Sequence, residues 1–183
     1  MSTPQPELIT QRLTLSLFNE TDISAIVSLA NNYEVAKNLG RMPFPYKLED
    51  AEFFLAEIVT TELTWKVSLL ETSEMIGTIG LRPIVKDEVS ELGFWYGQNF
   101  WGKGYATEAA NAVINLAFEE LALLKIEAGH FLVNEASGHV LKKVGFIQTG
   151  TSLRDCMAQK KKLNHAELEL KSENFVSNLT HSK

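Results

Sequence analysis

The residues with the clearest capacity for chemistry lie between Trp101 and Ala106, where the sequence reads Trp-Gly-Lys-Gly-Tyr-Ala. Bulky and aromatic residues up to Tyr96 predict a strand before this stretch, and an alanine-rich segment predicts a helix after it. Glycines let a ligand approach the backbone closely, and the first N–H groups of a helix have no partner within the helix. Together with the positive end of the helix dipole, these donors form an anion site, most often for phosphate. The stretch is therefore a candidate pyrophosphate site.

Two glycines before a helix also fit a plain tight turn, so the spacing alone leaves both interpretations open. The Walker pattern of phosphate-binding loops cannot be aligned here. The dinucleotide-binding fingerprint fails as well, because Thr107 stands where its third glycine belongs. The following helix is well defined, because its apolar residues recur at three- and four-residue spacing and form one face that can pack on a sheet. These residues are Ala106, Ala109, Ala110, Val113, Ile114, Leu116, Ala117 and Leu121.

Composition bounds the class of protein. The 183 residues are 45% hydrophobic and 22% charged, which suits one globular domain with a sizeable core. A net charge of −6 argues against a nucleic-acid-binding surface and favours cationic partners such as amines. The single cysteine, Cys156, cannot form an internal disulfide and fits a reducing cytoplasm. The first ten residues lack the apolar run of a signal peptide, and no stretch reaches the roughly 20 apolar residues of a membrane span. We therefore expect a cytoplasmic protein with no membrane partner.

The order of the predicted elements indicates one domain over residues 8–172, with flexible tails at 1–7 and 173–183. The three strands between Trp65 and Tyr96 form an antiparallel meander, whereas the next strand follows a helical crossover and is expected to be parallel to its predecessor. The lysines at 160–162 are interpreted as the exposed tip of a closing hairpin. The expected strands are Arg12–Phe18, Trp65–Glu71, Met75–Val85, Val89–Tyr96, Leu123–Val133, Phe146–Ala158 and Leu163–Lys171. The expected helices start after the N-cap Asp22, at Glu34, at Glu49, after the glycine turn and at Asn134.

A phosphate site preceded by a hairpin meander does not fit a doubly wound dinucleotide-binding fold. Four stretches point elsewhere when they are taken together: residues 9–15, Asp50-Ala51, residues 91–109, and Asn134-Glu-Ala-Ser with Val144-Gly-Phe. They resemble the GNAT superfamily of acyl-CoA-dependent N-acetyltransferases, in particular its ribosomal-protein N-terminal (RimJ/RimL-like) branch. The resemblance covers nearly the whole domain. It implies an α+β fold with a mixed, mostly antiparallel sheet of about seven strands, flanked by helices and splayed in the middle to hold acetyl-CoA.

The resemblance also implies which residues bind acetyl-CoA. Backbone groups at the end of the strand before the turn would pair with the pantetheine amides, and one N–H would polarise the thioester carbonyl. The backbone of the glycine turn would hold the pyrophosphate, although Asn99 occupies the first position of the family pattern, where glutamine or arginine is usual. Asn134 would contact pantetheine, cap its helix, or do both. The residues expected at acetyl-CoA are Phe94, Trp95, Tyr96, Trp101, Gly102, Lys103, Gly104, Tyr105, Ala106, Thr107, Asn134 and Ser137.

Two residues are candidates for catalysis. Glu91 resembles the carboxylate that in several relatives takes a proton from the acceptor amine, although a glutamate on a half-exposed strand is also consistent with a surface residue. Ser137 matches a serine near the leaving thiolate, and Leu141 stands where many relatives place a tyrosine acid. Protonation would then come from Ser137, from water or from no dedicated group, since a thiol of pKa about 8.5 is a fair leaving group. The four histidines, His130, His139, His165 and His181, show no metal spacing, only His130 stands out, and we expect no metal.

These features predict an enzyme that moves an acetyl group from acetyl-CoA to a primary amine by direct attack in a ternary complex. The acceptor would be a protein N-terminus or a small molecule, antibiotics included, and no nucleic acid is expected. A non-catalytic acyl-CoA-binding or sensing module remains an alternative because of the missing tyrosine, and a nucleotide-binding enzyme is a third that the element order disfavours. The acceptor pocket is expected between residues 38–46 and the hairpin near Lys160. Both a monomer and a homodimer remain open.

Overall fold

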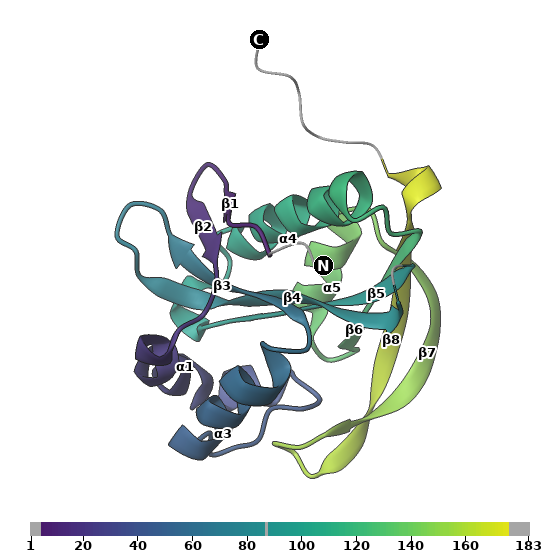
Figure 1. Cartoon of the computed structure of the whole chain (residues 1–183). Helices are drawn as coiled ribbons and strands as arrows, with labels where there is room; N and C mark the ends of the chain where they lie inside the picture. Colours follow the sequence, from purple (N-terminus) through teal and green to yellow (C-terminus); the bar gives the residue numbers. More distant parts are fainter. Residues whose placement is uncertain (1–4, 87, 176–183) are drawn as a thin grey trace.

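One sheet organises the chain in the computed structural model, which describes residues 5–86 and 88–175 (Figure 1). Within these residues it has eight strands in the order β1-β2-β3-β4-β5-β6-β8-β7. All neighbours are antiparallel except β5 and β6, which are parallel as expected. The bounds are β1 Leu8–Ile9, β2 Leu13–Ser16, β3 Leu63–Leu69, β4 Met75–Val85, β5 Val89–Tyr96, β6 Lys125–Phe131, β7 Ile147–Cys156 and β8 Lys161–Lys171. The mixed, mostly antiparallel sheet is confirmed, with the two-residue β1 as one strand more than expected.

Helices cover both faces of this sheet. In Figure 1, α4 lies above the sheet, whereas α1 and α3 lie below it. The bounds are α1 Ile23–Ala30, α2 Tyr33–Ala36, α3 Leu48–Phe53, α4 Tyr105–Asn115 and α5 Glu135–Lys143. Two of them continue as π-helical turns, α3 through Phe54–Ile58 and α4 through Leu116–Glu120, and 3₁₀ turns form at Glu20–Asp22, Gln98–Phe100 and Ser172–Asn174. None of the helices in the described residues is long and apolar enough to cross a membrane.

The core divides into two layers, one on each face of the sheet. The larger layer joins the sheet to α4 and α5, and the apolar stripe predicted for α4 is buried in it. The smaller layer joins α1, α2 and α3 to the other face and includes Met75 and the half-buried Trp95. Because side chains alternate between the faces of a strand, Phe94 and Tyr96 point to the α4 face, whereas Glu91 and Trp95 point to the α1–α3 face. We call the latter the acceptor face.

Parts of both expected tails contact the domain. Trp65 is fully buried, and its Nε1 donates to the carbonyl oxygen of Pro6 at 2.7 Å, while Gln5 donates to the carbonyl oxygen of Thr64 at 2.9 Å. At the other end, the Phe175 ring lies 5.0 Å from that of Phe118. Residues 1–4 and 176–183 of the expected tails lie outside the described residues.

Asp22 is the N-cap residue of α1, as expected, but its side chain does not cap the helix. A 3₁₀ turn runs directly into α1, so the helical segment starts earlier, and Asn19 caps it by accepting from the backbone N–H of Thr21. The Asp22 carboxylate instead accepts from the backbone N–H of Asn19 and pairs with Lys66 Nζ at 2.9 Å. It makes no side-chain hydrogen bond to the first turn of α1.

The sheet splays between β5 and β6. These strands pair only from Val89 to Glu91 with Lys125 to Glu127, and no ladder pairs the rest of β5 to β6 in the described residues. Because the two strands run in the same direction, the helices that follow them, α4 and α5, both begin at the splayed end. Two helix N-termini therefore flank one opening in the sheet.

Candidate active site

The backbone of β5 supplies a free edge along this opening. Gly97 N–H donates to the carbonyl oxygen of Ile76 at 2.9 Å, which fixes the hydrogen-bonding phase of the antiparallel β4–β5 ladder. Hydrogen-bonded and non-hydrogen-bonded pairs alternate in such a ladder. The backbone groups of Trp95 therefore bond to β4, whereas those of Phe94 and Tyr96 face the opening. The Tyr96 carbonyl oxygen accepts from Trp101 Nε1 at 2.8 Å. Phe94 thus offers an N–H and a carbonyl that no described group engages.

The glycine turn holds a second set of free donors. Gly102 and Gly104 have φ of +73° and +81°, a conformation that residues with a Cβ rarely adopt. Gly104 is the N-cap residue of α4, and the first helical bond runs from Glu108 N–H to its carbonyl oxygen. No backbone N–H from Gly102 to Thr107 donates to a group in the described part of the chain. This arrangement matches the predicted anion site.

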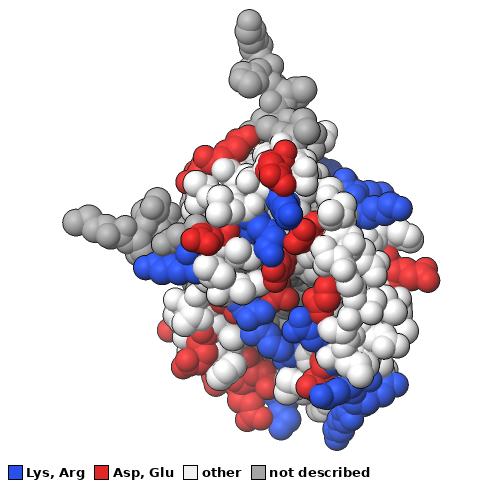
Figure 2. Space-filling model, turned by 90° about the vertical axis from the view of Figure 1, so that its right-hand side faces the viewer, with Lys and Arg blue, Asp and Glu red and all other residues white. Residues whose placement is uncertain are grey.

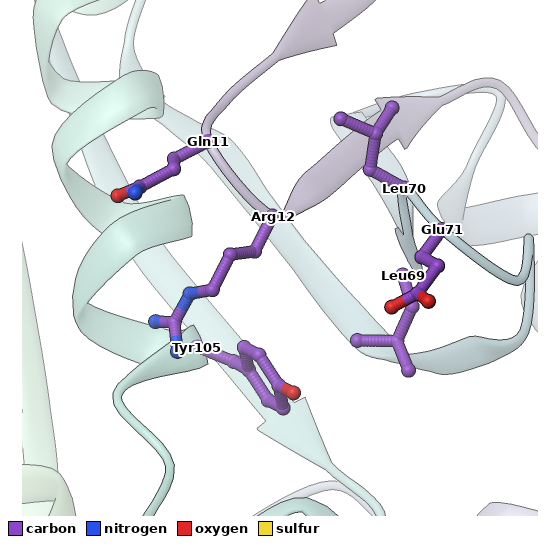
Figure 3. Close-up of a pocket in the computed structure, with 6 residues that line it drawn as sticks. All are labelled: Gln11, Arg12, Leu69, Leu70, Glu71 and Tyr105. Atoms are coloured by element: carbon purple, nitrogen blue, oxygen red, sulfur yellow. The ribbon is translucent and has the colours of Figure 1, made fainter.

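Arg12, which the sequence did not single out, clamps this turn from the N-terminal side (Figure 3). Its Nη1 donates to the carbonyl oxygen of Lys103 at 3.0 Å, and its guanidinium lies 4.7 Å from the centre of the Tyr105 ring. It also forms an ion pair with Glu108, in which Nε and Nη2 both donate to the single oxygen Oε2, each at 2.7 Å. Arg12 and Tyr105 line a pocket of about 270 Å³ with Gln11, Leu69, Leu70 and Glu71. Because Glu108 offsets its charge, the main effect of the guanidinium is to hold the turn in place through the Lys103 carbonyl oxygen.

Glu108 is the anchor of this clamp. Its Oε1 accepts from Thr10 Oγ1 at 2.7 Å and from the Arg12 backbone N–H at 2.8 Å. Burial acts to raise the pKa of Glu108, but the hydrogen bonds from Thr10 and Arg12 and the Arg12 charge outweigh it and hold the pKa below its usual range. The carboxylate therefore stabilises the fold above the ordinary glutamate pKa of about 4.3, and this contribution is lost as the pH falls through the lowered folded value.

We expect Glu108→Gln to lower the free energy of unfolding by about 1–3 kcal/mol at pH 7, because Arg12 loses its charged acceptor. The difference from the wild type should shrink as the pH falls below about 4, where the wild-type carboxylate also becomes protonated. Urea unfolding of both proteins between pH 3 and 7 measures this. A difference that does not change with pH would contradict the ionic role.

The second helix N-terminus carries Asn134 and Ser137. Asn134 caps α5, because its Oδ1 accepts from the Ser137 backbone N–H at 3.3 Å. Its Nδ2 donates to Ser137 Oγ at 2.9 Å, so the serine hydroxyl accepts one bond and keeps its own hydrogen free. Leu141 is buried in the core with 1% of its surface exposed. The capping alternative for Asn134 is thus present, and Ser137 remains able to donate a proton.

Glu91 lies on the acceptor face and is the last residue of β5 that pairs with β6. Its neighbours across the sheet are Arg82 of β4 and Glu127 of β6. Its Oε2 forms an ion pair with Arg82 Nη2, and both side chains are partly exposed. The guanidinium engages Oε2 of the carboxylate, so the side chain of Glu91 is tied to β4 through this pair. The ionic partner was not visible in the sequence, because it depends on the register of β4.

The described residues contain no group of three or more histidine, cysteine, aspartate and glutamate side chains that could hold a metal ion. Of the histidines, His130 packs against α5, where a Cβ on Gly138 would lie 2.6 Å from its Nε2. His165 lies on the acceptor face beside Glu167, at 3.2 Å from Nδ1 to Oε1. His139 is exposed on α5, and His181 lies outside the described residues.

These parts fit acetyl-CoA. A splayed strand pair, a free strand edge at Phe94 and unengaged donors at a helix N-terminus together suit an amide-containing chain that ends in a pyrophosphate. Residues 12–147 match the family described as the acetyltransferase (GNAT) domain, and this match takes in β5, the glycine turn and α4. The chain belongs to the GNAT acetyltransferase family.

Similarity to known GNAT proteins extends over most of the chain. An uncharacterized N-acetyltransferase of Bacillus subtilis, YoaA, is 32% identical over 163 residues, which cover 84% of this chain and 89% of that protein. The fold matches spermidine N-acetyltransferase from Vibrio cholerae, solved with CoA and spermine, with a TM-score of 0.77, 20% identity and coverage of 90% and 98%. It also matches ribosomal-protein-S5-alanine acetyltransferase from Vibrio fischeri, with a TM-score of 0.75, 18% identity and coverage of 93% and 99%.

This GNAT protein is therefore an acetyl-CoA-dependent N-acetyltransferase that acts on an amine. The structure brings the predicted site residues of β5, the glycine turn and α5 to one end of the splayed strands. It sets Glu91 at the closed end of the opening and on the acceptor face. Sequence reasoning missed Arg12 and Glu108, although both lie in stretches that carried the family resemblance.

Proposed function

We propose that the enzyme acetylates a singly charged primary amine, with the α-amine of a protein N-terminus as its first candidate acceptor, by direct attack in a ternary complex. The observation that carries this proposal is the opening between β5 and β6, which has an unengaged Phe94 N–H on its edge and the glycine turn at its end. Phe94 N–H would donate to the thioester oxygen, where negative charge develops during attack. The turn from Trp101 to Thr107 would hold the pyrophosphate, and Asn134 would contact pantetheine.

Charge pairing on the acceptor face supports a singly charged amine over a polyamine. Four carboxylates lie on this face near the opening, and each has a cationic partner: Glu91 with Arg82, Glu127 and Glu169 with Lys125, and Glu167 with Arg154. Figure 2, which views the molecule from the right-hand side of Figure 1, shows acidic and basic side chains intermingled around a shallow hollow. A polycation binds best to uncompensated negative charge, which these pairs reduce.

The fold does not choose between acceptor classes. The two solved structures named above share this fold, and their names assign spermidine to one and a ribosomal-protein alanine to the other. The resemblance of four sequence stretches to the ribosomal-protein branch supports the protein N-terminus. A small-molecule amine, polyamines and antibiotics included, is the second candidate, and the overall charge of −6 is what favours it.

Ser137 and Glu91 have proposed roles in this reaction. Ser137 would donate to the leaving thiolate, because Asn134 already occupies its acceptor side and orients the hydroxyl. Glu91 was one candidate for the base; the task proposed for it here is to hold the acceptor ammonium at the closed end of the opening, through the carboxylate oxygen that Arg82 does not engage. Substitution of Ser137 should lower turnover and substitution of Glu91 should raise the acceptor KM, in both cases with little change in acetyl-CoA binding.

The test is release of CoA thiol from acetyl-CoA with N-terminal peptides, spermine, aminoglycosides and amino acids as acceptors. We expect release with peptides that have a free α-amine and none with the same peptides blocked at the N-terminus. Glu91→Gln should raise the acceptor KM about tenfold with little change in the acetyl-CoA KM, since a positioning contact of about 1.4 kcal/mol is lost. If spermine is the only acceptor of the panel that gives turnover, a polyamine replaces the protein N-terminus as the proposed acceptor.

A further inference from the structure

The acceptor face has a gap in its side chains beside the opening. If the register of the last pair, Glu91 with Glu127, is continued, the next residues on this face are Gly93 on β5 and Gly129 on β6. A Cβ on Gly93 would meet no atom within 4 Å. Two glycines thus flank the opening at one level, where an amine could approach the edge of β5 next to Phe94.

His165 reaches into this gap from the strand behind β6. It pairs across β8 and β6 with Phe131, yet its ring lies over Gly129, where a Cβ would be 2.1 Å from Cε1 and 2.8 Å from Nε2. Only the absence of a side chain at Gly129 admits the ring. Since β6 separates β8 from the opening, the ring extends toward the opening with its Cε1 and Nε2 atoms leading.

The other ring nitrogen is held by a carboxylate. His165 Nδ1 lies 3.2 Å from Glu167 Oε1, and the same oxygen accepts from Arg154 Nη2 at 3.0 Å and from Ser152 Oγ. A carboxylate at Nδ1 favours the tautomer with hydrogen on that nitrogen, which leaves Nε2 as a proton acceptor. Nε2 makes no hydrogen bond within residues 5–86 and 88–175.

We propose that His165 is the base that takes the proton from the acceptor amine, an inference that rests on the proposed function. The ammonium gives one proton to Nε2, and the freed nitrogen lone pair forms the C–N bond to the thioester carbon. The C–S bond breaks, and its electron pair leaves on the sulfur. The nitrogen loses its second proton to the thiolate, through Ser137 or water, and His165 returns its proton to solvent. The products are the acetylated amine, CoA thiol and one proton.

The surroundings of His165 keep the ring neutral near pH 7. Burial, with 14% of the side chain exposed, is the largest influence and lowers the pKa of His165; Arg154 on β7 and His130 on β6 act in the same direction. Glu167 acts to raise the pKa of His165, but the net shift is still downward. The base is thus unprotonated in the pH range where an acceptor arrives as an ammonium ion.

The test compares wild type, His165→Gln, Glu167→Gln and the surface control His139→Gln. We expect His165→Gln to lower kcat/KM for the peptide acceptor by about 10²-fold with CoA affinity within twofold, since general base catalysis supplies 10²- to 10⁴-fold. In the wild type, kcat/KM should fall at low pH as His165 becomes protonated, and this acid limb of the pH profile should vanish in His165→Gln. In Glu167→Gln it should move to lower pH, because the group that raises the histidine pKa is gone. His139→Gln should keep the wild-type profile.

If His165→Gln turns over within threefold of the wild type and keeps the acid limb, His165 is not the base, while the proposed function stands. An acid limb that persists in His165→Gln and vanishes in Glu91→Gln returns the role to Glu91. Wild-type protein that releases no CoA with any amine overturns the proposed function and the base with it, and that pattern differs from both of the others.

Discussion

Phe94→Pro is expected to lower kcat by about 10²- to 10³-fold and to leave the sheet intact. Proline removes one backbone N–H, and at this position the N–H faces the opening and not β4. Loss of one donor from an oxyanion site typically costs 10² to 10³ in kcat. Proline is tolerated in a strand where its missing N–H would have faced no neighbouring strand, and β5 has no partner beyond Glu91 on that side among the described residues.

Two further variants separate the N–H from other effects. Phe94→Ala removes the ring from its packing against the core and keeps the N–H, so its kcat should stay within about tenfold of wild type. Trp95→Pro removes the N–H of the next residue, which bonds to β4. This variant should unfold or have a markedly lower melting temperature. Steady-state kinetics and thermal unfolding followed by circular dichroism report both quantities. Equal kcat in Phe94→Pro and Phe94→Ala would exclude Phe94 N–H as the oxyanion donor.

Features that depend on local sequence were predicted well. The bounds of β4 and β5 were expected as Met75–Val85 and Val89–Tyr96 and are found so, because alternation and turn residues define both strands. Gly102 and Gly104 form the turn that was expected before the helix, and both have a positive φ. The mixed sheet with its splay is confirmed, but it was implied by the family resemblance, since periodicity does not reveal where neighbouring strands part.

Features that depend on register between distant strands were not predicted. Arg12 and Glu108 are 96 residues apart, and nothing local in either stretch indicates that they form an ion pair. Glu91 was expected to be a base or a surface glutamate, and its ion pair with Arg82 was not foreseen because the β4–β5 register sets it. Among the histidines the sequence directed attention to His130 on the central strand. The ring over Gly129 belongs to His165, which can be seen only once β6 and β8 are aligned.

Gly104→Ala is expected to weaken CoA binding about tenfold. The residue holds φ +81° at the N-cap of α4, and the left-handed conformation costs a residue with a Cβ about 1–2 kcal/mol. The added Cβ would also lie 3.4 Å from Arg12 Nη2, inside the clamp on the turn. The free turn relaxes to escape that cost and turns its N–H groups away from the pyrophosphate. Binding of CoA then requires the strained shape, and about 1.4 kcal/mol corresponds to a tenfold loss of affinity.

Gly102→Ala separates strain from contact with the ligand. A Cβ at Gly102 meets no atom of the protein within 4 Å, so its effect on the free enzyme comes from the φ of +73° alone. Gly150→Ala on β7 is the matched control, since it has neither a positive φ nor a close neighbour. Calorimetric titration with CoA should show tenfold losses in the two turn variants and none in the control. If the glycine turn did not hold the pyrophosphate, all three variants would bind CoA alike, because the strained residues would then lie away from the ligand.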